Sequence, residues 1–298
     1  MLMNYSLARQ PEQVLVHRVI GRSYYAECSD PPASIKCMYG GVGRYVDDGG
    51  RAYSVDDEGY LVLNRGNGYS VEKSTPTPME TFCIFFPDDL VASVAADLTR
   101  DANARLAAPT GDGAVLFDLI EHRHPHEGEV ARRVASIRGA AVAGRLSDDW
   151  LEEAMFELAA SLVAAQETTR VRIARLPWAR AATRRELYRR IHVARDYMHA
   201  CLAEPFSLAE TARAAALSPY HFLRAFRTIL GVTPRAYVTA ERVVRARRLL
   251  EQTSLSVTEV AAQTGYESLP SFSTLFRKRT GLAPVQYRRA HRQMRNPR

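Results

Sequence analysis

The sequence lacks the long apolar runs and the cysteine patterns that mark several classes of protein. No stretch of its 298 residues approaches the ~18 apolar positions that a membrane span needs, and the N-terminus lacks the pattern of a secretory signal peptide. The four cysteines, Cys28, Cys37, Cys83 and Cys201, form no CxxC pair or other metal-binding spacing. We therefore expect a soluble, cytoplasmic protein without a cofactor, whose cysteines are small buried hydrophobes rather than a redox sensor.

Histidines are scarce where a metal-dependent barrel enzyme would need them. Such enzymes hold their metal with histidines on barrel strands, and the strand-rich part of this sequence offers only His17. A second group comprises His122, His124 and His126, but Pro125 and polar neighbours favour a solvated loop over a metal site. We expect no metal site and no enzymatic activity, and a metal-dependent barrel enzyme is kept as an alternative.

Charge is distributed unevenly along the chain. The whole sequence has 40 basic and 33 acidic side chains, a net charge of +7. Residues 183–298 hold 21 basic and 8 acidic side chains, a net charge of +13, which leaves −6 for the remainder. This asymmetry indicates a basic domain that meets a polyanion and an acidic domain with another role, although a merely solvated basic surface would give the same charge.

The N-terminal region has the pattern of a small β-barrel. Short runs rich in β-branched and aromatic residues alternate with turns rich in Gly, Asn and Asp, which supply the positive φ angles of tight hairpins. Pro76 and Pro78 are expected to delay the last strand. The predicted strands are 15–20, 35–39, 60–63, 69–72 and 81–86.

Apolar residues take a helical period after about Asp88. One stripe comprises Val130, Val134, Ile137 and Ala141, and a second comprises Leu151, Met155, Leu158 and Leu162. The second stripe would be buried equally well against the barrel of its own chain or against the same helix of a second chain. Residues 169–182 are expected to form a linker.

The last third of the chain contains an internal repeat with a period near fifty residues. Ser207, Glu210 and Ala212 recur at an offset of 49 as Ser256, Glu259 and Ala261. Phe222, Phe226, Arg227, Gly231, Pro234 and Tyr237 recur at an offset of 50 as Phe272, Phe276, Arg277, Gly281, Pro284 and Tyr287. Nine matches in one register indicate two copies of one structural unit.

Each copy has the pattern of a helix-turn-helix unit. A capping box begins each first helix, at Ser207 or Ser256, and Gly265 suits the left-handed position that ends a helix. The second helix carries two phenylalanines four residues apart, so one side faces a core and the other faces outward. Pro234 to Gln252 is expected to form a connecting helix of about 28 Å, near the ~34 Å between successive major-groove openings. A purely helical protein-interaction bundle would keep the repeat without needing the +13 charge.

Residues 183–298 resemble the DNA-binding domain of AraC/XylS-type transcription regulators. The stretch from Gly265 to Ser268 and the later Phe272, Gly281 and Pro284 follow the family signature, while Pro270 departs from it. The resemblance implies an all-α domain with helix-turn-helix subdomains at about 207–231 and 256–281. It also implies a multidomain chain with a cupin-like sensor domain at 1–110 and a helical dimerisation or linker region at 111–182.

The repeat also predicts which side chains contact DNA. The resemblance places base contacts at Tyr220, Leu223 and Arg224, and a guanidinium at Arg224 can bond both acceptors of guanine. The second unit offers weaker readers, which favours discrimination through thymine methyl groups and DNA shape. Its base-contacting candidates are Leu269, Ser271, Ser273 and Thr274. The phosphate-contacting candidates of both units are Arg227, Arg277, Lys278 and Arg279.

The function expected from these patterns is sequence-specific transcription regulation. The partners are double-stranded DNA, a second copy of the chain, a small-molecule effector and, for an activator, RNA polymerase. Aromatic residues of the barrel are the candidates for an effector pocket. The pocket residues we expect are Tyr24, Tyr39, Tyr53, Tyr69 and Phe82. The alternatives are a barrel enzyme fused to a DNA-binding domain and an architectural DNA-binding protein without sequence preference.

Overall fold

The computed structural model describes residues 4–6, 15–87, 89–99 and 119–295. These residues form two compact units, Met1–Asp196 and Tyr197–Arg298. The second unit begins 14 residues after the expected start at 183, because much of one helix, α5 (Ala181–Ala200), packs within the N-terminal unit. Positions 111–118 of the expected helical region lie outside the described residues.

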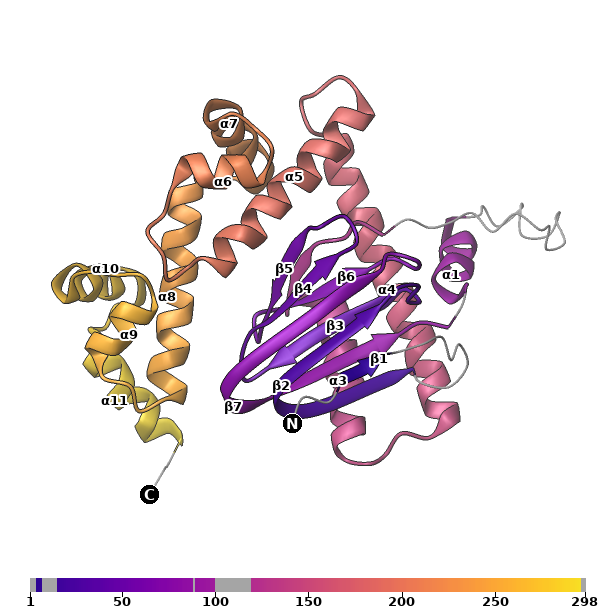
Figure 1. Ribbon diagram of the computed structural model, residues 1–298, viewed down its shortest axis with the longest axis horizontal. Helices are drawn as coiled ribbons and strands as arrows, with labels where there is room; N and C mark the ends of the chain where they lie inside the picture. Colours follow the sequence, from indigo (N-terminus) through magenta and orange to yellow (C-terminus); the bar gives the residue numbers. More distant parts are fainter. Residues whose placement is uncertain (1–3, 7–14, 88, 100–118, 296–298) are drawn as a thin grey trace, which may run out of the picture. The chain divides into compact units, whose positions relative to one another are not determined.

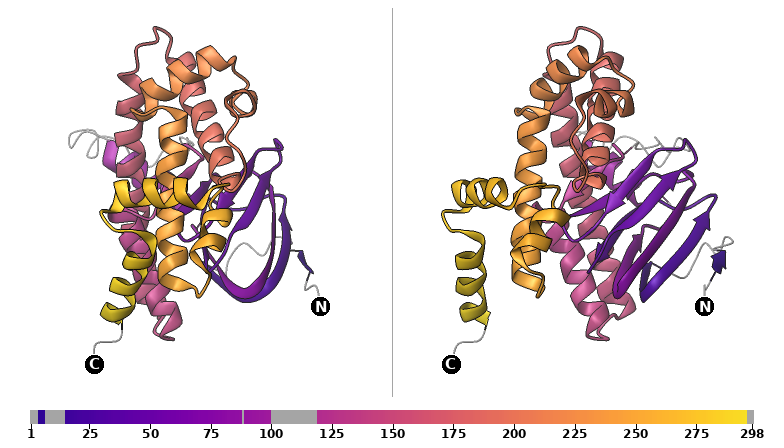
Figure 2. Two further views of the ribbon diagram at one scale, coloured as in Figure 1. Left: turned by 90° about the vertical axis from the view of Figure 1, so that its left-hand side faces the viewer. Right: turned by 60° about the vertical axis from the view of Figure 1, so that its left-hand side comes forward.

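A single curled sheet forms the centre of the N-terminal unit (Figures 1 and 2). It is antiparallel apart from one parallel pair, and it curls toward a barrel, which confirms the predicted small β-barrel. Four short strands, at 4–6, 43–47, 52–55 and 123–125, were not predicted. Around the middle two, the turns carry the stronger sequence signal. The order is β1 (Asn4–Ser6), β2 (Val16–Cys28), β7 (Tyr69–Phe85), β3 (Ser34–Tyr39), β6 (Gly59–Leu63) and β8 (Arg123–Pro125), with β4 (Gly43–Asp47) and β5 (Ala52–Val55) joined through β7.

Strand β7 joins both of the strands that were predicted separately at 69–72 and 81–86. The two prolines were expected to delay the last strand, but β7 runs without a break from Tyr69 to Phe85. The register on β2 shows how the prolines fit, since Gly21 pairs with Met79 and Ser23 pairs with Ser74. Residues 75–78 therefore lie in a bulge, where proline's missing amide costs no ladder hydrogen bond.

Three helices cover one face of the sheet. They are α1 (Leu90–Thr99), α3 (Gly128–Val142) and α4 (Asp148–Ala174). Met155, Leu158 and Leu162 of α4 are buried in one core with strand residues such as Ile35 and Phe82. The apolar stripe of α4 therefore packs on the sheet of its own chain, which resolves the alternative left open by the sequence.

The opposite face of the sheet, the inner face, has a separate core. It is made only of strand residues, among them Tyr24, Met38, Tyr45, Tyr69 and Val71. Alternate residues of β3 divide between the two cores, since Ile35 and Cys37 contact the helices while Met38 lies on the inner face.

The segment predicted as a linker is largely helical. Helix α4 continues to Ala174, and only a short turn separates it from α5, which begins at Ala181. The expected linker over 169–182 therefore consists of the end of α4, a turn at 175–180 that contains Pro177, and the start of α5.

The C-terminal unit is all-α, as expected. The connecting helix α8 (Pro234–Gln252) has the predicted bounds, with Pro234 in its first turn and Thr233 as its N-cap. The remaining helices are α6 (Leu208–Ala214), α7 (Pro219–Leu230), α9 (Val257–Gln263), α10 (Leu269–Thr280) and α11 (Pro284–Arg295).

Candidate nucleic-acid interface

Two helix-turn-helix units, α6 with α7 and α9 with α10, begin with serine caps. The Ser256 hydroxyl accepts from the Glu259 amide at 3.2 Å, and the Glu259 carboxylate accepts from the Ser256 amide at 2.6 Å. This reciprocal pair is the predicted capping box. In the first unit only half of the box is observed, where the Ser207 hydroxyl accepts from the Glu210 amide.

The turn of each unit requires one residue with a positive φ angle. Gly265 has φ +77° in the second unit, as the sequence predicted. The equivalent residue of the first unit is Ala216, with φ +51°. Alanine in the left-handed region is strained, because its Cβ approaches the following carbonyl oxygen. The two turns therefore share one backbone conformation, which the glycine of the second unit adopts without strain and the alanine of the first unit does not.

Buried aromatic rings hold each second helix against its unit. In α7, the rings of Phe222 and Phe226 lie 5.4 Å apart, and Tyr237 lies 5.9 Å from Phe226. The second unit repeats this contact, with 5.5 Å between Phe272 and Phe276 and 5.3 Å between Phe276 and Tyr287. All four phenylalanines are fully buried. This packing fixes which side of α7 and α10 faces solvent.

The outward side of α7 carries the predicted base-reading residues. Tyr220 is 78% exposed, and Leu223 and Arg224 are also exposed. Arg227 is exposed one turn later on the same helix. The long side chains of Tyr220 and Arg224 are thus free to reach base edges from a helix of twelve residues.

The outward side of α10 differs in chemistry. Leu269 and Thr274 are exposed, Ser273 is half-buried, and the Ser271 hydroxyl lies 3.3 Å from that of the N-cap Ser268. Three exposed cations, Arg277, Lys278 and Arg279, follow in the last turn. This face presents short hydroxyl and aliphatic groups first and a cationic end afterwards.

Two arginines of α8 serve the fold of the C-terminal unit. Arg242 donates from Nε to the Leu202 carbonyl at 2.9 Å and from Nη2 to the Glu204 carbonyl at 2.5 Å. Arg247 donates to the Tyr287 hydroxyl at 2.8 Å. Burial lowers the pKa of Arg242 from its usual value. These two guanidinium groups therefore tie α8 to its neighbours.

The five residues predicted for an effector pocket lie on two different faces of the sheet. Tyr24, Tyr53 and Tyr69 belong to the inner face. Tyr39 and Phe82 belong to the face covered by helices, where the Arg138 guanidinium stacks 3.8 Å above the Tyr39 ring. The structure therefore brings three of the five together and separates them from the other two.

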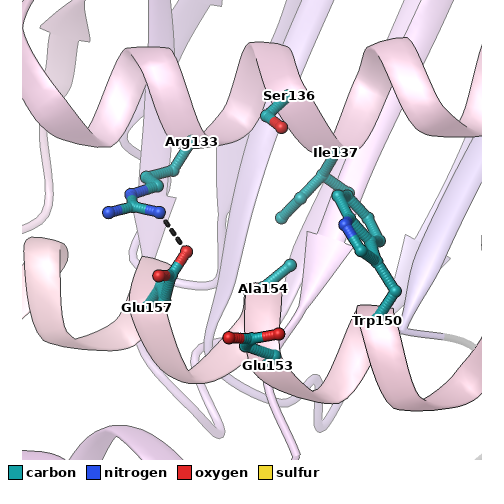
Figure 3. A pocket seen from close by; sticks show the side chains of 7 residues that line it. All are labelled: Arg133, Ser136, Ile137, Trp150, Glu153, Ala154 and Glu157. Carbon is teal, nitrogen blue, oxygen red and sulfur yellow. Dashed lines mark hydrogen bonds and ion pairs between the residues drawn. The ribbon is translucent and has the colours of Figure 1, made fainter.

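A surface pocket lies between α3 and α4, away from all five of these residues (Figure 3). Trp150, Ile137 and Ala154 form its apolar part, and the ion pair of Arg133 with Glu157 closes one side. Its lining contains no predicted pocket residue.

The histidine group at 122–126 is packed into the fold rather than solvated, with His122 buried and His124 and His126 half-buried. His122 is 5% exposed, and its ring stacks on His124 at 3.9 Å and on His192 of α5 at 4.2 Å. Burial lowers the pKa of all three, for His124 to about 3. The expectation of a solvated loop was wrong because α5, more than sixty residues later in the sequence, covers this segment.

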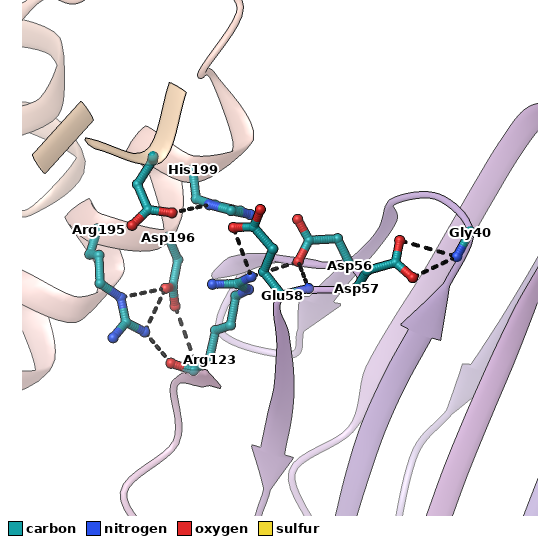
Figure 4. A network of polar contacts seen from close by, with 9 residues as sticks. Gly40, Asp56, Asp57, Glu58, Arg123, Arg195, Asp196 and His199 are labelled. Atoms are coloured by element: carbon teal, nitrogen blue, oxygen red, sulfur yellow. Dashed lines mark hydrogen bonds and ion pairs between the residues drawn. The ribbon is translucent and has the colours of Figure 1, made fainter. Parts of the chain in front are cut away.

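Ion pairs reinforce the same contact within the N-terminal unit (Figure 4). Arg123 donates from Nη2 to Asp56 at 2.6 Å, and its backbone amide donates to the Asp196 carboxylate at 3.4 Å. Arg195 donates to Asp196 at 2.9 Å and to the Arg123 carbonyl. Strand β8 is thereby joined both to the β5–β6 turn and to α5.

Groups with potential for metal or redox chemistry are dispersed within the described part of the N-terminal unit. Among described residues within the N-terminal unit, no three histidine, cysteine or carboxylate groups converge on one point. Burial raises the pKa of the Cys28 and Cys37 thiols. Both thiols therefore stay protonated and weakly nucleophilic. No helix in the described part of the chain is long and apolar enough to cross a membrane.

Comparison with known proteins gives matches that fit this geometry. The helix-turn-helix domain family matches residues 211–290. The HTH-type transcriptional regulator Rv1931c of Mycobacterium tuberculosis is 40% identical over 83 residues, 28% of this chain and 32% of that protein. The bifunctional transcriptional activator/DNA repair enzyme AdaA of Bacillus subtilis is 34% identical over 93 residues, 31% of this chain and 44% of that protein.

A solved structure, the DNA-binding domain of AdpA in complex with a target DNA, is 32% identical. The match covers 36% of this chain and 96% of that chain, with a TM-score of 0.34. The family match over residues 211–290 identifies the C-terminal part of the chain as a helix-turn-helix DNA-binding domain. It belongs to the AraC/XylS type, as its repeat and signature residues indicated. The chain covers less than half of the length of the two curated relatives.

Proposed function

We propose that this chain is a sequence-specific, DNA-binding transcription regulator of the AraC/XylS type. The observation that carries the proposal is the pair of helices, α7 and α10, held by equivalent aromatic contacts with chemically different outward faces. The charge of the C-terminal unit supports it, since residues 197–298 hold 16 basic and 6 acidic side chains. A basic surface supplies the sequence-independent part of DNA affinity through release of counterions.

The two units take different parts in recognition. Tyr220, Leu223 and Arg224 of α7 read base edges in the major groove, with Arg224 on guanine. The side chains of α10 discriminate less, through thymine methyl groups and groove shape. Arg227 and the cationic end of α10 grip phosphates. The length of α8 supports reading of two successive groove segments by one chain.

Regulation comes from the N-terminal unit, where the sheet binds a small-molecule effector on its inner face. Relatives that match the C-terminal part include proteins named as activators, which supports activation through RNA polymerase. The regulator acts as a homodimer, so that two chains cover paired sites. Since the α4 stripe is buried within its own chain, the dimer uses other surfaces of the N-terminal unit. Sedimentation of the full chain that shows only monomer, with and without operator DNA, would rule the dimer out.

Binding-site selection with the full chain tests the proposal. The selected DNA should share one site with two base-specific segments about one helical turn apart, and affinity should fall steeply as salt rises. Equal binding to all sequences would identify an architectural DNA-binding protein instead. A folded chain that shows no salt-dependent binding to any DNA would contradict both functions.

A further inference from the structure

Lysine is used sparingly in this chain and is concentrated on the inner face of the sheet. Lys36, Lys73 and Lys278 are its lysines, and arginine occupies every other one of the 40 basic positions. Lys36 lies on β3 and Lys73 on β7, and both are buried. The sequence signal for Lys36 is its place inside a strand of apolar residues, between Ile35 and Cys37.

The Lys36 ammonium group is enclosed by aromatic rings. Its side chain is 0% exposed, and Nζ donates to the Tyr69 hydroxyl at 2.8 Å. The same nitrogen lies 3.8 Å from the centre of the Phe85 ring and 4.5 Å from that of Tyr69. An ammonium group has three N–H donors, and one hydrogen bond leaves two of them directed at ring faces or other neighbours.

The Lys73 ammonium group shares this surface. Its Nζ donates to the Met79 carbonyl at 2.9 Å and lies 5.8 Å from the centre of the Tyr24 ring. Cys83 acts electrostatically on both lysines, which places the two ammonium groups in one neighbourhood. Two cations therefore share an interior of phenol, thiol and apolar groups, whose buried carboxylate, Asp47, accepts from the Tyr53 hydroxyl and pairs with Arg51.

No carboxylate among the described residues pairs with either lysine. The buried acids nearby are committed elsewhere, since Glu80 pairs with Arg18 and Arg138, and Asp47 pairs with Arg51. A buried cation without an anion is costly and is normally compensated by an opposite charge. The Lys36 ammonium group is thus a buried cation without a paired carboxylate, whereas the charge of Glu80 acts on Lys73. Conformational stability alone does not favour a buried cation of this kind.

Adaptable side chains fill the space beside these lysines. A Cβ placed on Gly43 would lie 2.3 Å from the terminal methyl group of Met38, and one on Gly41 would lie 3.0 Å from the Met79 sulfur. Both methionines are buried on the inner face. Methionine is flexible and repacks readily, so a ligand can take the volume that these two side chains occupy.

We propose that the inner face binds a small organic carboxylate, with the carboxylate on Lys36 and an apolar body against the tyrosine and methionine side chains. The Tyr69 hydroxyl stays beside the ammonium group as a second donor, and Lys73 adds its charge to the same interior. This inference rests on the proposed function, because it gives the effector of the regulator a chemical class. It adds Lys36 to the tyrosine-lined pocket, and the positive charge of Lys36 selects a negatively charged ligand.

Lysine-selective labelling of the full chain tests the proposal directly. Protein grown with ¹³C-lysine gives Cε signals for Lys36, Lys73 and Lys278 only, and Lys36→Met and Lys73→Met assign the first two. Phenylacetate and hexanoate are the probes, and phenylacetamide and hexanamide are their neutral controls. We expect at least one of the two carboxylates to shift the Lys36 signal. The corresponding amide should leave the Lys36 signal in place, and the Lys278 signal should not move with any probe.

Variants separate the charge from the strand that carries it. Lys36→Met should lower the affinity for the responding carboxylate roughly 10- to 100-fold, as expected for loss of a hydrogen bond to a charged group. Ile35→Val changes the neighbouring residue on the helix-covered face and should keep the response. An equal loss of affinity in both variants would show that the effect comes from disturbance of strand β3 and not from removal of the ammonium group. This result would contradict the assignment to Lys36.

The outcomes also distinguish this inference from the proposed function. Signals of Lys36 and Lys73 that stay in place with both carboxylates, or a shift confined to Lys278, would overturn the carboxylate site. Operator binding measured on the same samples reports the DNA-binding function independently. Intact DNA binding with an unresponsive Lys36 would overturn this inference alone, whereas absent DNA binding would overturn the function on which it rests.

Discussion

Arg224 and Arg277 are both exposed arginines on the second helices of the repeat, but they lie at different positions along those helices. Arg224 lies in the first half of α7, where base edges are within reach, and Arg277 lies in the last turn of α10. Arg224→Ala should cost about 1 to 3 kcal/mol on the best operator and relax preference at one base pair. Arg277→Ala should weaken all sequences about equally and lower the salt slope by about one unit.

Binding-site selection with these two variants is the measurement. Unchanged base preference in Arg224→Ala, or altered preference in Arg277→Ala, would show that the reading and gripping roles are assigned to the wrong residues.

Lys36 gives a second prediction at this scale, because burial lowers its pKa to about 8 from 10.5. The unfolded chain therefore holds this proton up to a higher pH than the folded chain does, so the lysine costs stability below pH 8 and the cost disappears as pH approaches 10.5. The cost at pH 7 corresponds to roughly 3 kcal/mol, offset in part by the contacts with Tyr69 and Phe85.

Lys36→Met should accordingly be more stable than wild type at pH 7, and its advantage should shrink toward pH 10. His17 and Cys28 titrate nearby, and the Cys83 thiol and the Tyr69 hydroxyl also lie beside the ammonium group. Wild type and variant are therefore compared at each pH by urea unfolding. A variant that is less stable at pH 7, with a difference independent of pH, would make Lys36 a structural residue.

At the scale of elements, the two turns of the repeat provide matched substitutions. Ala216→Gly relieves a left-handed alanine and should stabilise the C-terminal unit by roughly 0.5 to 1 kcal/mol. Gly265→Ala should destabilise it by more than about 2 kcal/mol, since the new Cβ would lie 2.6 Å from the Leu202 carbonyl oxygen as well as at a positive φ angle.

Unfolding followed by far-UV circular dichroism measures both changes. Trp150 and Trp178 are the chain's tryptophans and lie in the N-terminal unit, so the tryptophan fluorescence transition should stay in place for both variants. Shifts of the same sign in the two variants would contradict the strain assigned to Ala216.

The contact between β8 and α5 predicts sensitivity to acid. The folded pKa values of His122, His124 and His192 are lowered below the 6.5 of the unfolded chain by burial. The free energy of unfolding therefore falls as the pH drops below 6.5, because these histidines bind protons in the unfolded chain and stay neutral in the folded chain. For His124 alone, with a pKa of about 3, the fall from pH 6.5 to 5 costs about 2 kcal/mol.

His124→Gln should flatten this dependence in urea unfolding followed by tryptophan fluorescence. His221→Gln, which changes an exposed histidine of the C-terminal unit, is the control and should leave it unaltered. Equal pH dependence in wild type and His124→Gln would remove the histidine stack as its cause.

For the whole molecule, the internal repeat made the helices of the C-terminal unit predictable from the sequence. The N-terminal unit has no such repeat, so its fold was predicted less completely. Capping serines, the glycine turn and phenylalanines four residues apart act locally, so they specify helices α6 to α11 without knowledge of tertiary contacts. The barrel strands were found where alternation was strong, and the short strands β1, β4, β5 and β8 were missed. Contacts between distant segments, such as His122 with His192 or Lys36 with Phe85, depend on chain topology that local patterns do not encode.

The packing of α5 within the N-terminal unit has a consequence for any attempt to produce the DNA-binding part separately. A fragment that begins at residue 183, where the sequence suggests a boundary, would carry Tyr188 and His192 without the histidine partners that now cover them. The exposed rings would promote aggregation of the fragment. A fragment that begins near Tyr197 would omit them, and light scattering of the two fragments at equal concentration should show association in the longer one only.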